Sequence, residues 1–521
     1  MDKFKKILKD IGAKTKDILA KTKVLLIKGV HKTAKGLDYD PVAKQTTLRT
    51  ELIAGVVTFL SMAYILTVNP NQIFGSTASP YWSSAFIATA LGAVVGTLLM
   101  AFLAKMPLAQ ASGMGLNAIV GGLIGGWAGY AAAFTPGQAF FLVLISGILF
   151  LALSLIKIKG KTFRELVFDG MPGAVRGAIS VGIGLFIAYV GLQGAGVIVA
   201  DEHVQVALVN LSSWQACKGA VVCMIGLFLI AVLDKLNVKG AIIIGILGAT
   251  VAGIPFGITD LSVLAGKASG ISWKFWENIA NFFAGESTVF GSFVHVFTGE
   301  GVVPEGVSVF SVIMVVITMC MIDMFDTMGT IVGCCSASRV LSDENGKPHN
   351  YGEIMLSDSI ATCTGAMLGT STVTTFVESG TGVSSGGRTG LTALTAAGLF
   401  FLSIFAMPLC AVIPGAATAA ALIYVGVLMM KHNLSSIDFG DVIKGTSAFL
   451  TIVIMVLSYS ITKGIGVGII AYTVMSAIVY LVEAIKFAIT KKNKPTWDVS
   501  IVAMIITLLF CIYFFVPTTL F

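Results

Sequence analysis

Apolar runs of membrane-crossing length recur along the whole chain. A helix needs about 20 mainly apolar residues to cross a hydrocarbon core about 30 Å thick. From Leu52 onward the pattern predicts fourteen spans, at residues 52–72, 83–104, 110–126, 138–157, 172–192, 217–233, 240–255, 308–333, 352–369, 372–388, 390–411, 414–431, 446–462 and 465–485. We therefore expect an all-α polytopic membrane protein.

Composition supports this interpretation. Hydrophobic residues make up 56% of the 521 residues and charged residues only 12%, whereas a soluble domain has about 25% charged residues. The formal net charge is +7, but the lysines cluster in the N-terminal arm and in short loops, so no nucleic-acid partner is expected. The 8 cysteines show no paired metal spacing, and neither a metal nor another cofactor is predicted.

Basic residues in the loops predict an orientation. Cytoplasmic loops of membrane proteins carry an excess of Lys and Arg. If the N-terminus is cytoplasmic, every second loop is cytoplasmic too, and these are the loops with the basic residues: Lys105, Lys157, Lys159, Lys161, Arg164, Lys235, Lys239, Arg339, Lys347, Arg388, Lys431, Lys444, Lys486, Lys491, Lys492 and Lys494. We expect a multi-pass protein of the inner (plasma) membrane with a cytoplasmic N-terminus.

The two ends of the chain each allow two interpretations. Residues 1–49 form a basic arm in which Phe4, Ile7, Leu8 and Ile11 recur at near-helical spacing. This suits an amphipathic helix on an anionic lipid surface, or else a solvated charged tail. The C-terminal segment 488–521 contains another apolar run, which either crosses the membrane or lies along it.

Two short segments share a similar sequence motif. Residues 110–117 (QASGMGLN) and 378–384 (ESGTGVS) both place Ser-Gly-X-Gly after a polar residue, followed by an aliphatic and a small polar one. They open the third and tenth predicted spans, which are seven spans apart. An odd offset places them in opposite orientations, as in a 7+7 inverted repeat.

Glycine pairs in short apolar segments have two interpretations, close packing of helices or interrupted helices that face a cavity. Because the glycine pairs occupy matching positions in spans three and ten, interrupted helices are the favoured interpretation here. The β-branched run Ser371–Thr375 favours extended chain, so we expect a short strand followed by a half-helix in span ten and a similar break in span three. Ser112 and Ser379 are the expected N-caps. The helix ends would then offer backbone amides to a polar ligand at the bilayer midplane.

Three carboxylates fall in or beside these apolar segments: Asp323, Asp326 and Glu378. A charged side chain at the bilayer centre costs at least about 2.5–3.5 kcal/mol, so such groups are functional candidates. Asp323 and Asp326 are three residues apart and share one helix face, where mutual repulsion favours protonation of one of them. The alternative is that one of them only caps or pairs within the bundle.

Carboxylates facing helix amides suit a flat, neutral, polar ligand. Phe59, Tyr64 and Phe325 are candidates to stack on it, although aromatic residues in spans more often only pack. Lys and Arg are nearly absent from the spans, so a strongly anionic ligand fits poorly. Arg388 is interpreted as an anchor at the cytoplasmic end of span ten.

Several motifs resemble those of a known family. TFLSMAYILTVNP (58–70), GMGLNA (113–118), DMFDTMGTIVG (323–333), ESGTGVSSGGRTGLTA (378–393) and ALIYVGVLMM (421–430) are similar to the AzgA-like purine permeases. These belong to the nucleobase–ascorbate transporter (NCS2) superfamily. Ser112 and Gly380-Thr381 stand where the family usually has Pro and Ala-Ala.

The resemblance implies a division into domains. A core domain (50–157 and 308–411) would carry substrate against a gate domain (172–255 and 412–487) in a homodimer, with 256–307 as an extracytoplasmic loop.

The resemblance also implies roles for particular residues. Asp326 and Glu378 would bind the base, and Asp323 and Asn117 match positions implicated in substrate binding or in ion coupling. The remaining predicted substrate contacts are Gly113, Gly115, Ser379, Gly380, Thr381 and Phe59.

The expected function is proton-coupled uptake of a purine nucleobase by an elevator-like motion, with Asp323 and Asp326 in proton coupling. An enzyme is not expected, because an intramembrane aspartyl protease needs its aspartates on different helices. The alternative is a transporter or channel for anions or other small solutes on the same fold. The sequence leaves open which purine is carried and whether H⁺ or Na⁺ is the coupled ion.

The coupling role assigned to Asp323 is testable. We predict that Asp323→Asn weakens the pH dependence of base uptake more than it weakens base binding, because the amide cannot exchange a proton. Uptake and equilibrium binding measured at two pH values compare the two effects. An unchanged pH dependence of uptake would remove Asp323 from the coupling mechanism.

Overall fold

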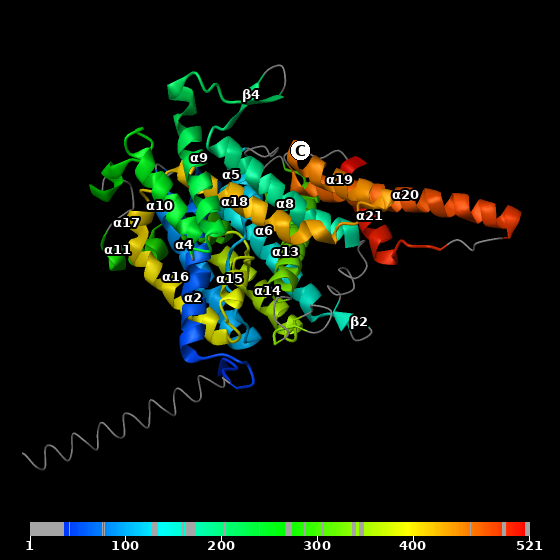
Figure 1. Cartoon of the computed structure of the whole chain (residues 1–521), viewed down its shortest axis with the longest axis horizontal. Coiled ribbons are helices and arrows are strands. Elements are labelled where there is room, and N and C mark those ends of the chain that lie inside the picture. Colours follow the sequence, from blue (N-terminus) through cyan, green and yellow to red (C-terminus); the bar gives the residue numbers. More distant parts are fainter. Residues whose placement is uncertain are drawn as a thin grey trace, which may run out of the picture.

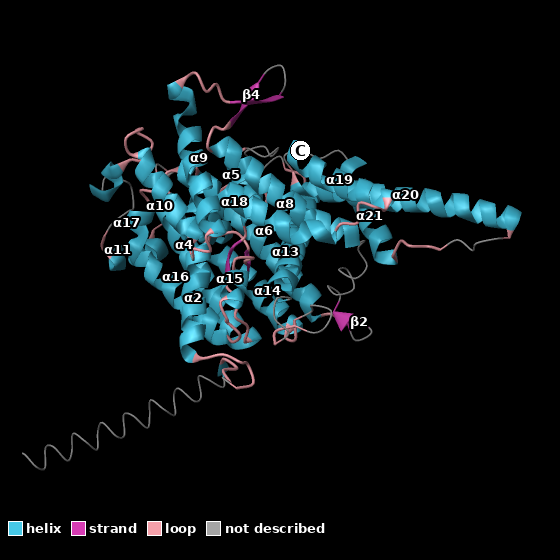
Figure 2. Ribbon diagram, in the orientation of Figure 1, coloured by secondary structure: helices cyan, strands magenta, loops and turns pink. Residues whose placement is uncertain are grey.

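The structure is a computed structural model. It describes residues 36–40, 42–75, 77, 79–126, 134–158, 161–162, 173–201, 205–238, 240–265, 273–285, 288–304, 307–335, 340–342, 348–458, 460–491 and 496–515. Most of the predicted N-terminal arm, at 1–35, lies outside these residues. The described chain is a bundle of helices with short strands, as Figures 1 and 2 show.

Each predicted span of the first half coincides with an element of the structure. In chain order these are α2 (Leu48–Met62) with α3 (Ile65–Phe74), α4 (Trp82–Leu99) with the π-helix η1 (Met100–Ala104), β1 (Gln110–Ser112) with α5 (Met114–Gly125), α6 (Pro136–Leu155), α8 (Gly173–Gly194), α9 (Trp214–Lys235) and α10 (Ala241–Gly253). Two hairpins lie between spans, β2 (Lys157–Ile158) with β3 (Lys161–Thr162) and β4 (Ile198–Asp201) with β5 (Gln205–Leu208).

The second half repeats the order. Its spans are α13 (Val309–Cys335), α14 (Tyr351–Leu368), β6 (Val373–Thr375) with α15 (Ser379–Ser384), α16 (Gly390–Ser403) with η4 (Ile404–Ala406) and α17 (Met407–Cys410), α18 (Gly415–Asn433) with η5 (Leu434–Ser436), α19 (Val442–Leu457) and α20 (Ile461–Thr490). Eight helices of the described chain are long and apolar enough to cross a membrane. The number of fourteen crossings stays a prediction.

The two broken spans meet at a short strand pair. Strands β1 and β6 are antiparallel, with Gln110 opposite Thr375 and Ser112 opposite Val373. A half-helix follows each strand, so the predicted interruption of spans three and ten is confirmed. Gly113 is required at the end of β1, because a Cβ atom there would lie 2.9 Å from both Thr372 Oγ1 and Thr374 Cγ2.

The predicted N-caps are wrong. Helix α5 has Gly113 at its N-cap, and α15 has Glu378. The strand conformation continues through Ser112, whose hydroxyl is used in bonds to Asn69 and Asn117 instead of the helix amides.

Helices from the two halves of the chain interleave in two packing groups. In the group called the core group below (α2–α6 and α13–α16), α14 packs on α4 and α6, and α16 packs on α2 and α4. In the gate group (α8–α10 and α18–α20), α18 packs on α8 and α9, and α19 packs on α8 and α20. The α8–α18 contact is close, because a Cβ at Gly184 would lie 2.8 Å from the Gly426 carbonyl oxygen.

Two regions add helices outside the predicted spans. Residues 256–307, expected to be a loop, contain η2 (Leu261–Ala265), α11 (Phe275–Ala284), α12 (Val289–His295) and the π-helix η3 (Val296–Glu300), and α12 packs on α6. At the C-terminus, α21 (Ile501–Phe515) packs against α20, where the Thr473 and Thr507 hydroxyls are 2.8 Å apart. The outer part of α20 extends beyond the bundle in Figure 1.

Helix α19 begins with a charged cap outside the predicted span. The Asp441 carboxylate accepts hydrogen bonds from the Ile443 and Lys444 amides at 2.9 and 3.1 Å. These bonds, the one from Lys444 foremost, hold the pKa of Asp441 below its usual value.

Two glycines of α16 provide a stability test. A Cβ at Gly390 would collide with the Ala101 carbonyl, whereas a Cβ at Gly398 would meet nothing within 4 Å. We predict that Gly390→Ala destabilises the protein by about 1–3 kcal/mol through overpacking. Gly398→Ala should be neutral or slightly stabilising, because alanine favours helix. Thermal unfolding of both variants in detergent measures the difference, and equal midpoints would contradict the packing at Gly390.

Candidate functional site

The centre of the candidate site is a buried pair of side chains, Tyr64 and Glu378. Tyr64 lies at the junction of α2 and α3, and its hydroxyl donates a hydrogen bond of 2.6 Å to Glu378 Oε1. Glu378 is only 3% exposed. A buried carboxylate needs such partners, because an unpaired one is costly. Tyr64 was expected to stack on a ligand, and it instead orients the glutamate.

Asp326 of α13 reaches the same place from another helix. Asp326 and Glu378 both line a small cavity of about 30 Å³, together with Gly113 and Met114 at the start of α5. The first amides of a helix have no partner within the helix. Two carboxylates and a helix N-terminus therefore border one small space.

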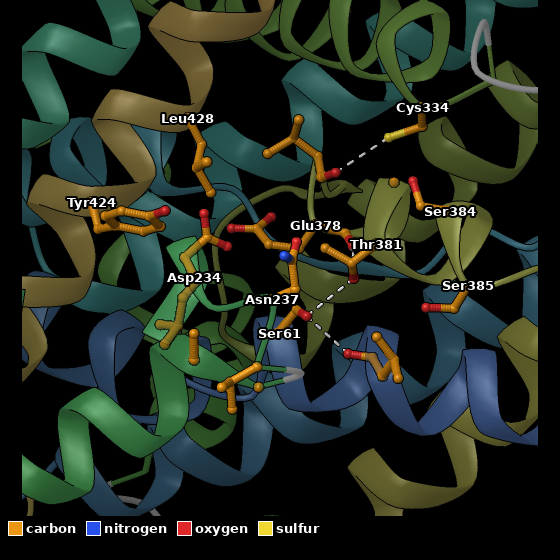
Figure 3. A pocket seen from close by; sticks show the side chains of 17 residues that line it. Ser61, Asp234, Asn237, Cys334, Glu378, Thr381, Ser384, Ser385, Tyr424 and Leu428 are labelled. Carbon is orange, nitrogen blue, oxygen red and sulfur yellow. Dashed lines mark hydrogen bonds between the residues drawn. The ribbon is translucent and has the colours of Figure 1, made fainter. Parts of the chain in front are cut away.

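Glu378 also borders a larger cavity of about 410 Å³, shown in Figure 3. This size is within the range of small-molecule sites. The cavity lies between the two packing groups. The core group contributes Ser61, Cys334, Glu378, Gly380, Thr381, Ser384 and Ser385, and opposite them lie Asp234, Asn237, Tyr424 and Leu428.

Hydrogen bonds shape the core side of this cavity. The Thr381 hydroxyl donates to the Glu378 carbonyl oxygen at 2.7 Å and lies 3.0 Å from the Ser61 hydroxyl. Across the cavity, the side chains of Tyr424 and Asp234 point toward each other (Figure 3). Gly380 and Thr381, two of the predicted substrate contacts, line this cavity.

Two of the predicted backbone contacts are occupied within the protein. The Gly113 amide donates to the Thr372 carbonyl at 2.8 Å, and the Gly380 amide donates to the Val377 carbonyl at 3.0 Å. The strand pair and the turn before α15 therefore use these two amides, while Gly113 and Gly380 themselves line the two cavities.

Four other predicted contacts border neither of the two carboxylate cavities. Phe59 packs edge-on against Phe400, with ring centroids 5.0 Å apart, and lines a separate apolar cavity. Gly115 faces Ile461, Ile183 and Ile322. Ser379 is bonded to the backbone of Ala109. The Asn117 side-chain oxygen accepts hydrogen bonds from Ser112 and Ser371, beside the β1–β6 strand pair.

The two aspartates of α13 face different neighbours. Asp323 is 1% exposed, accepts a 2.9 Å hydrogen bond from Thr362 of α14, and borders neither cavity. A separation of three residues on a helix leaves about 60° between side-chain directions, enough to turn Asp323 toward α14 and Asp326 toward the cavity. The side chain of Phe325 lies outside the described residues.

Sequence reasoning missed three carboxylates. Asp358, fully buried in α14, accepts hydrogen bonds from Gln110, Thr327 and the amide and hydroxyl of Thr375. Its position in the apolar run 352–369 was the available signal.

Glu51 accepts hydrogen bonds from the Arg388 amide and the Thr392 hydroxyl. Asp234, at a predicted loop boundary, carried no signal.

Arg388 stabilises the end of a helix. Its guanidinium donates to the carbonyl oxygens of Val383 and Gly387 at 2.6 and 2.7 Å, which caps the C-terminal end of α15. Within the described chain, no group of three His, Cys, Asp or Glu side chains is placed to hold a metal ion.

Comparison with known proteins identifies the class. The profile described as "Permease family" matches residues 49–467. The chain is 37% identical to the guanine/hypoxanthine permease PbuO of Bacillus subtilis over 441 residues (83% of this chain, 93% of PbuO). It is 36% identical to the adenine permease AdeP of Escherichia coli over 433 residues (82% and 87%). The chain therefore belongs to this permease family, and its resemblance to the AzgA-like branch is confirmed.

Solved structures support the fold. The transmembrane domain of the cyanobacterial bicarbonate transporter BicA aligns with a TM-score of 0.53 at 17% identity, covering 79% of this chain and 97% of that domain. SLC26A9 aligns with a TM-score of 0.52 at 10% identity, covering 87% and 70%. These proteins share the 7+7 inverted-repeat fold, so that expectation is confirmed.

The Asp358 network provides a test of the site's framework. The Asp358 carboxylate accepts hydrogen bonds from Gln110, Thr327 and Thr375, so Asp358→Asn would replace bonds to a charged group by weaker bonds to a neutral amide. We predict a loss of about 1–3 kcal/mol of stability. Asp441→Asn is the control, because Asn caps a helix as well as Asp does. Thermal unfolding in detergent compares them, and an unchanged midpoint for Asp358→Asn would contradict the network.

Proposed function

We propose that the protein is a secondary transporter that carries purine nucleobases across the cell membrane. The observation that supports this most directly is the placement of Glu378, a buried carboxylate with a tyrosine donor, between two cavities. The relatives named as adenine and guanine/hypoxanthine permeases supply the substrate class.

The chemistry of the cavities suits a neutral purine. Glu378 and Asp326 offer acceptors to the N–H groups along one edge of a base. The first amides of α5 supply donors beside them, and the Tyr64 hydroxyl holds the Glu378 carboxylate in place. No Lys or Arg is among the described residues that line either cavity, which disfavours anionic substrates.

The proposed mechanism is elevator-like movement of the core group against the gate group, driven by a proton gradient. The larger cavity lies between the two groups, so sliding of one past the other would open and close it. Asp326 is the proposed proton carrier at the substrate. Asp323 lies three residues before Asp326 on α13. It would act through a change in this helix rather than by touching the base. The protein would work as a homodimer in the inner membrane, with a cytoplasmic N-terminus.

A second candidate is transport of anions or other small solutes, because BicA, which shares the fold, is named a bicarbonate transporter. The carboxylates of the site argue against it. Flux of chloride, sulfate or bicarbonate through proteoliposomes, without purine uptake, would favour it.

Transport by the purified protein tests the proposal. Radiolabelled hypoxanthine uptake into proteoliposomes, with unlabelled bases as competitors and at two pH values, is expected to be saturable and faster when the outside is acidic. Absence of uptake for every purine would contradict the proposed substrate class. Uptake that needs Na⁺ and ignores pH would contradict proton coupling alone.

The role of Glu378 has its own test. We predict that Glu378→Gln lowers uptake about 10- to 100-fold, because a hydrogen bond to a charged group contributes about 1.5–3 kcal/mol. The near-isosteric change should leave the protein folded in detergent. Glu277→Gln, at an exposed position of α11, is the matched control with wild-type uptake. Normal uptake by Glu378→Gln would remove Glu378 from the site.

A further inference from the structure

A separate cavity of about 440 Å³ lies at the other end of the interface between the two groups. It is bordered by the end of α3, the end of α8 and the start of α18. Its polar lining consists mainly of amides, Asn71, Gln72 and Gln193, together with Thr418. None of the described residues that line it is charged.

Two segments of the chain, helix α18 and the consecutive helices α2 and α3, run past both interface cavities; the cavity of Asn71, Gln72, Gln193 and Thr418 is called the amide cavity below. On α18, Gly415, Thr418 and Leu422 line the amide cavity, and Tyr424 and Leu428 line the Glu378 cavity. On α2 and α3, Ser61 lines the Glu378 cavity and Gln72 the amide cavity. Tyr64 and Gln72 are eight residues apart, which is about 12 Å along a helix. In the predicted orientation the amide cavity is on the extracytoplasmic side.

The amides of this cavity have hydrogen-bonding capacity left over. The Oε1 and Nε2 atoms of Gln72 are both buried and make no hydrogen bond within the described chain. Asn71 uses its oxygen to accept a 2.7 Å bond from Trp82 Nε1, which leaves its NH₂ group. Gln193 uses its nitrogen to bond the Tyr189 hydroxyl at 3.3 Å, which leaves its oxygen. A buried polar group without a partner is unfavourable, so the Gln72 amide would be stabilised by a hydrogen-bonding molecule in the cavity that Gln72 lines.

The wall of the cavity also leaves room for a ring. A Cβ atom added at Gly75, Gly194 or Gly415 would meet nothing within 4 Å. The backbone at these exposed positions is therefore accessible to a flat molecule in the cavity.

We propose that this cavity is an outer loading site for the same neutral purine that the Glu378 site is proposed to carry. The inference rests on the proposed function for its ligand. An amide side chain donates and accepts side by side, and Asn or Gln pairs in this way with the N6 and N7 atoms of adenine. The uncharged lining fits a neutral base. Binding here would hold the base about 12 Å from Tyr64, within the interface that the elevator motion opens.

Transport kinetics test the loading role. Gln72→Leu removes the unbonded amide, and Gly194→Leu fills the cavity from a position with space for a side chain. Each is expected to raise the KM for hypoxanthine uptake about tenfold, Gln72→Leu through one lost hydrogen bond and Gly194→Leu through steric exclusion of the base, with a much smaller change in Vmax. Gly398→Leu, at another glycine with nothing within 4 Å, is the control for adding leucine and should match wild type. A KM within twofold of wild type for both cavity variants would overturn the proposal.

Direct binding separates this inference from the proposed function. Equilibrium binding of radiolabelled hypoxanthine to purified Glu378→Gln protein is expected to leave a weak site, which the double variant Glu378→Gln/Gln72→Leu lacks. Residual binding that is equal in both variants would overturn the loading site, even where wild-type uptake supports purine transport. Absence of uptake and binding in the wild type would instead show that the proposed function had failed.

Discussion

The structure depends on satisfying backbone hydrogen bonds in the middle of a membrane. Extended chain inside lipid leaves N–H and C=O groups without partners, which is why single strands do not span bilayers. Here β1 and β6 each supply what the other lacks, and the pairing extends to the Gly113 amide with Thr372 and the Phe376 amide with Ala109. This pairing allows two helices to begin in the interior, and the candidate site is built where they begin.

Four carboxylates in or beside the predicted spans fall into two kinds. Asp358 and Glu51 are surrounded by donors and join elements far apart in the chain: Asp358 joins β1, α13, α14 and β6, and Glu51 joins α2 to the start of α16. Glu378 and Asp326 border cavities instead. The first kind stabilises the frame, and the second kind leaves hydrogen-bonding capacity for a ligand. Burial alone does not distinguish them; the donors supplied by neighbouring elements do.

The sequence predicted the elements well and the contacts less well. Hydropathy and the repeated Ser-Gly-X-Gly motif located the spans and the two interruptions, because those depend on local composition. The orientation of particular side chains depends on neighbours from distant segments. Phe59 meets Phe400, Asp323 meets Thr362, and the Gly113 amide meets Thr372. Spacing along the chain does not reveal such partners, and for the same reason the gate-side Asp234 was missed.

The strand pair also bears on how such a chain arose. Each strand belongs to a different repeat, and the partner of each is antiparallel to it. A half-length polypeptide with a single strand would leave that strand's polar edge exposed in lipid. A second copy, inserted in the reverse direction, would supply the missing edge. The pairing is therefore consistent with a one-repeat ancestor that assembled in both membrane orientations before duplication and fusion joined the two copies.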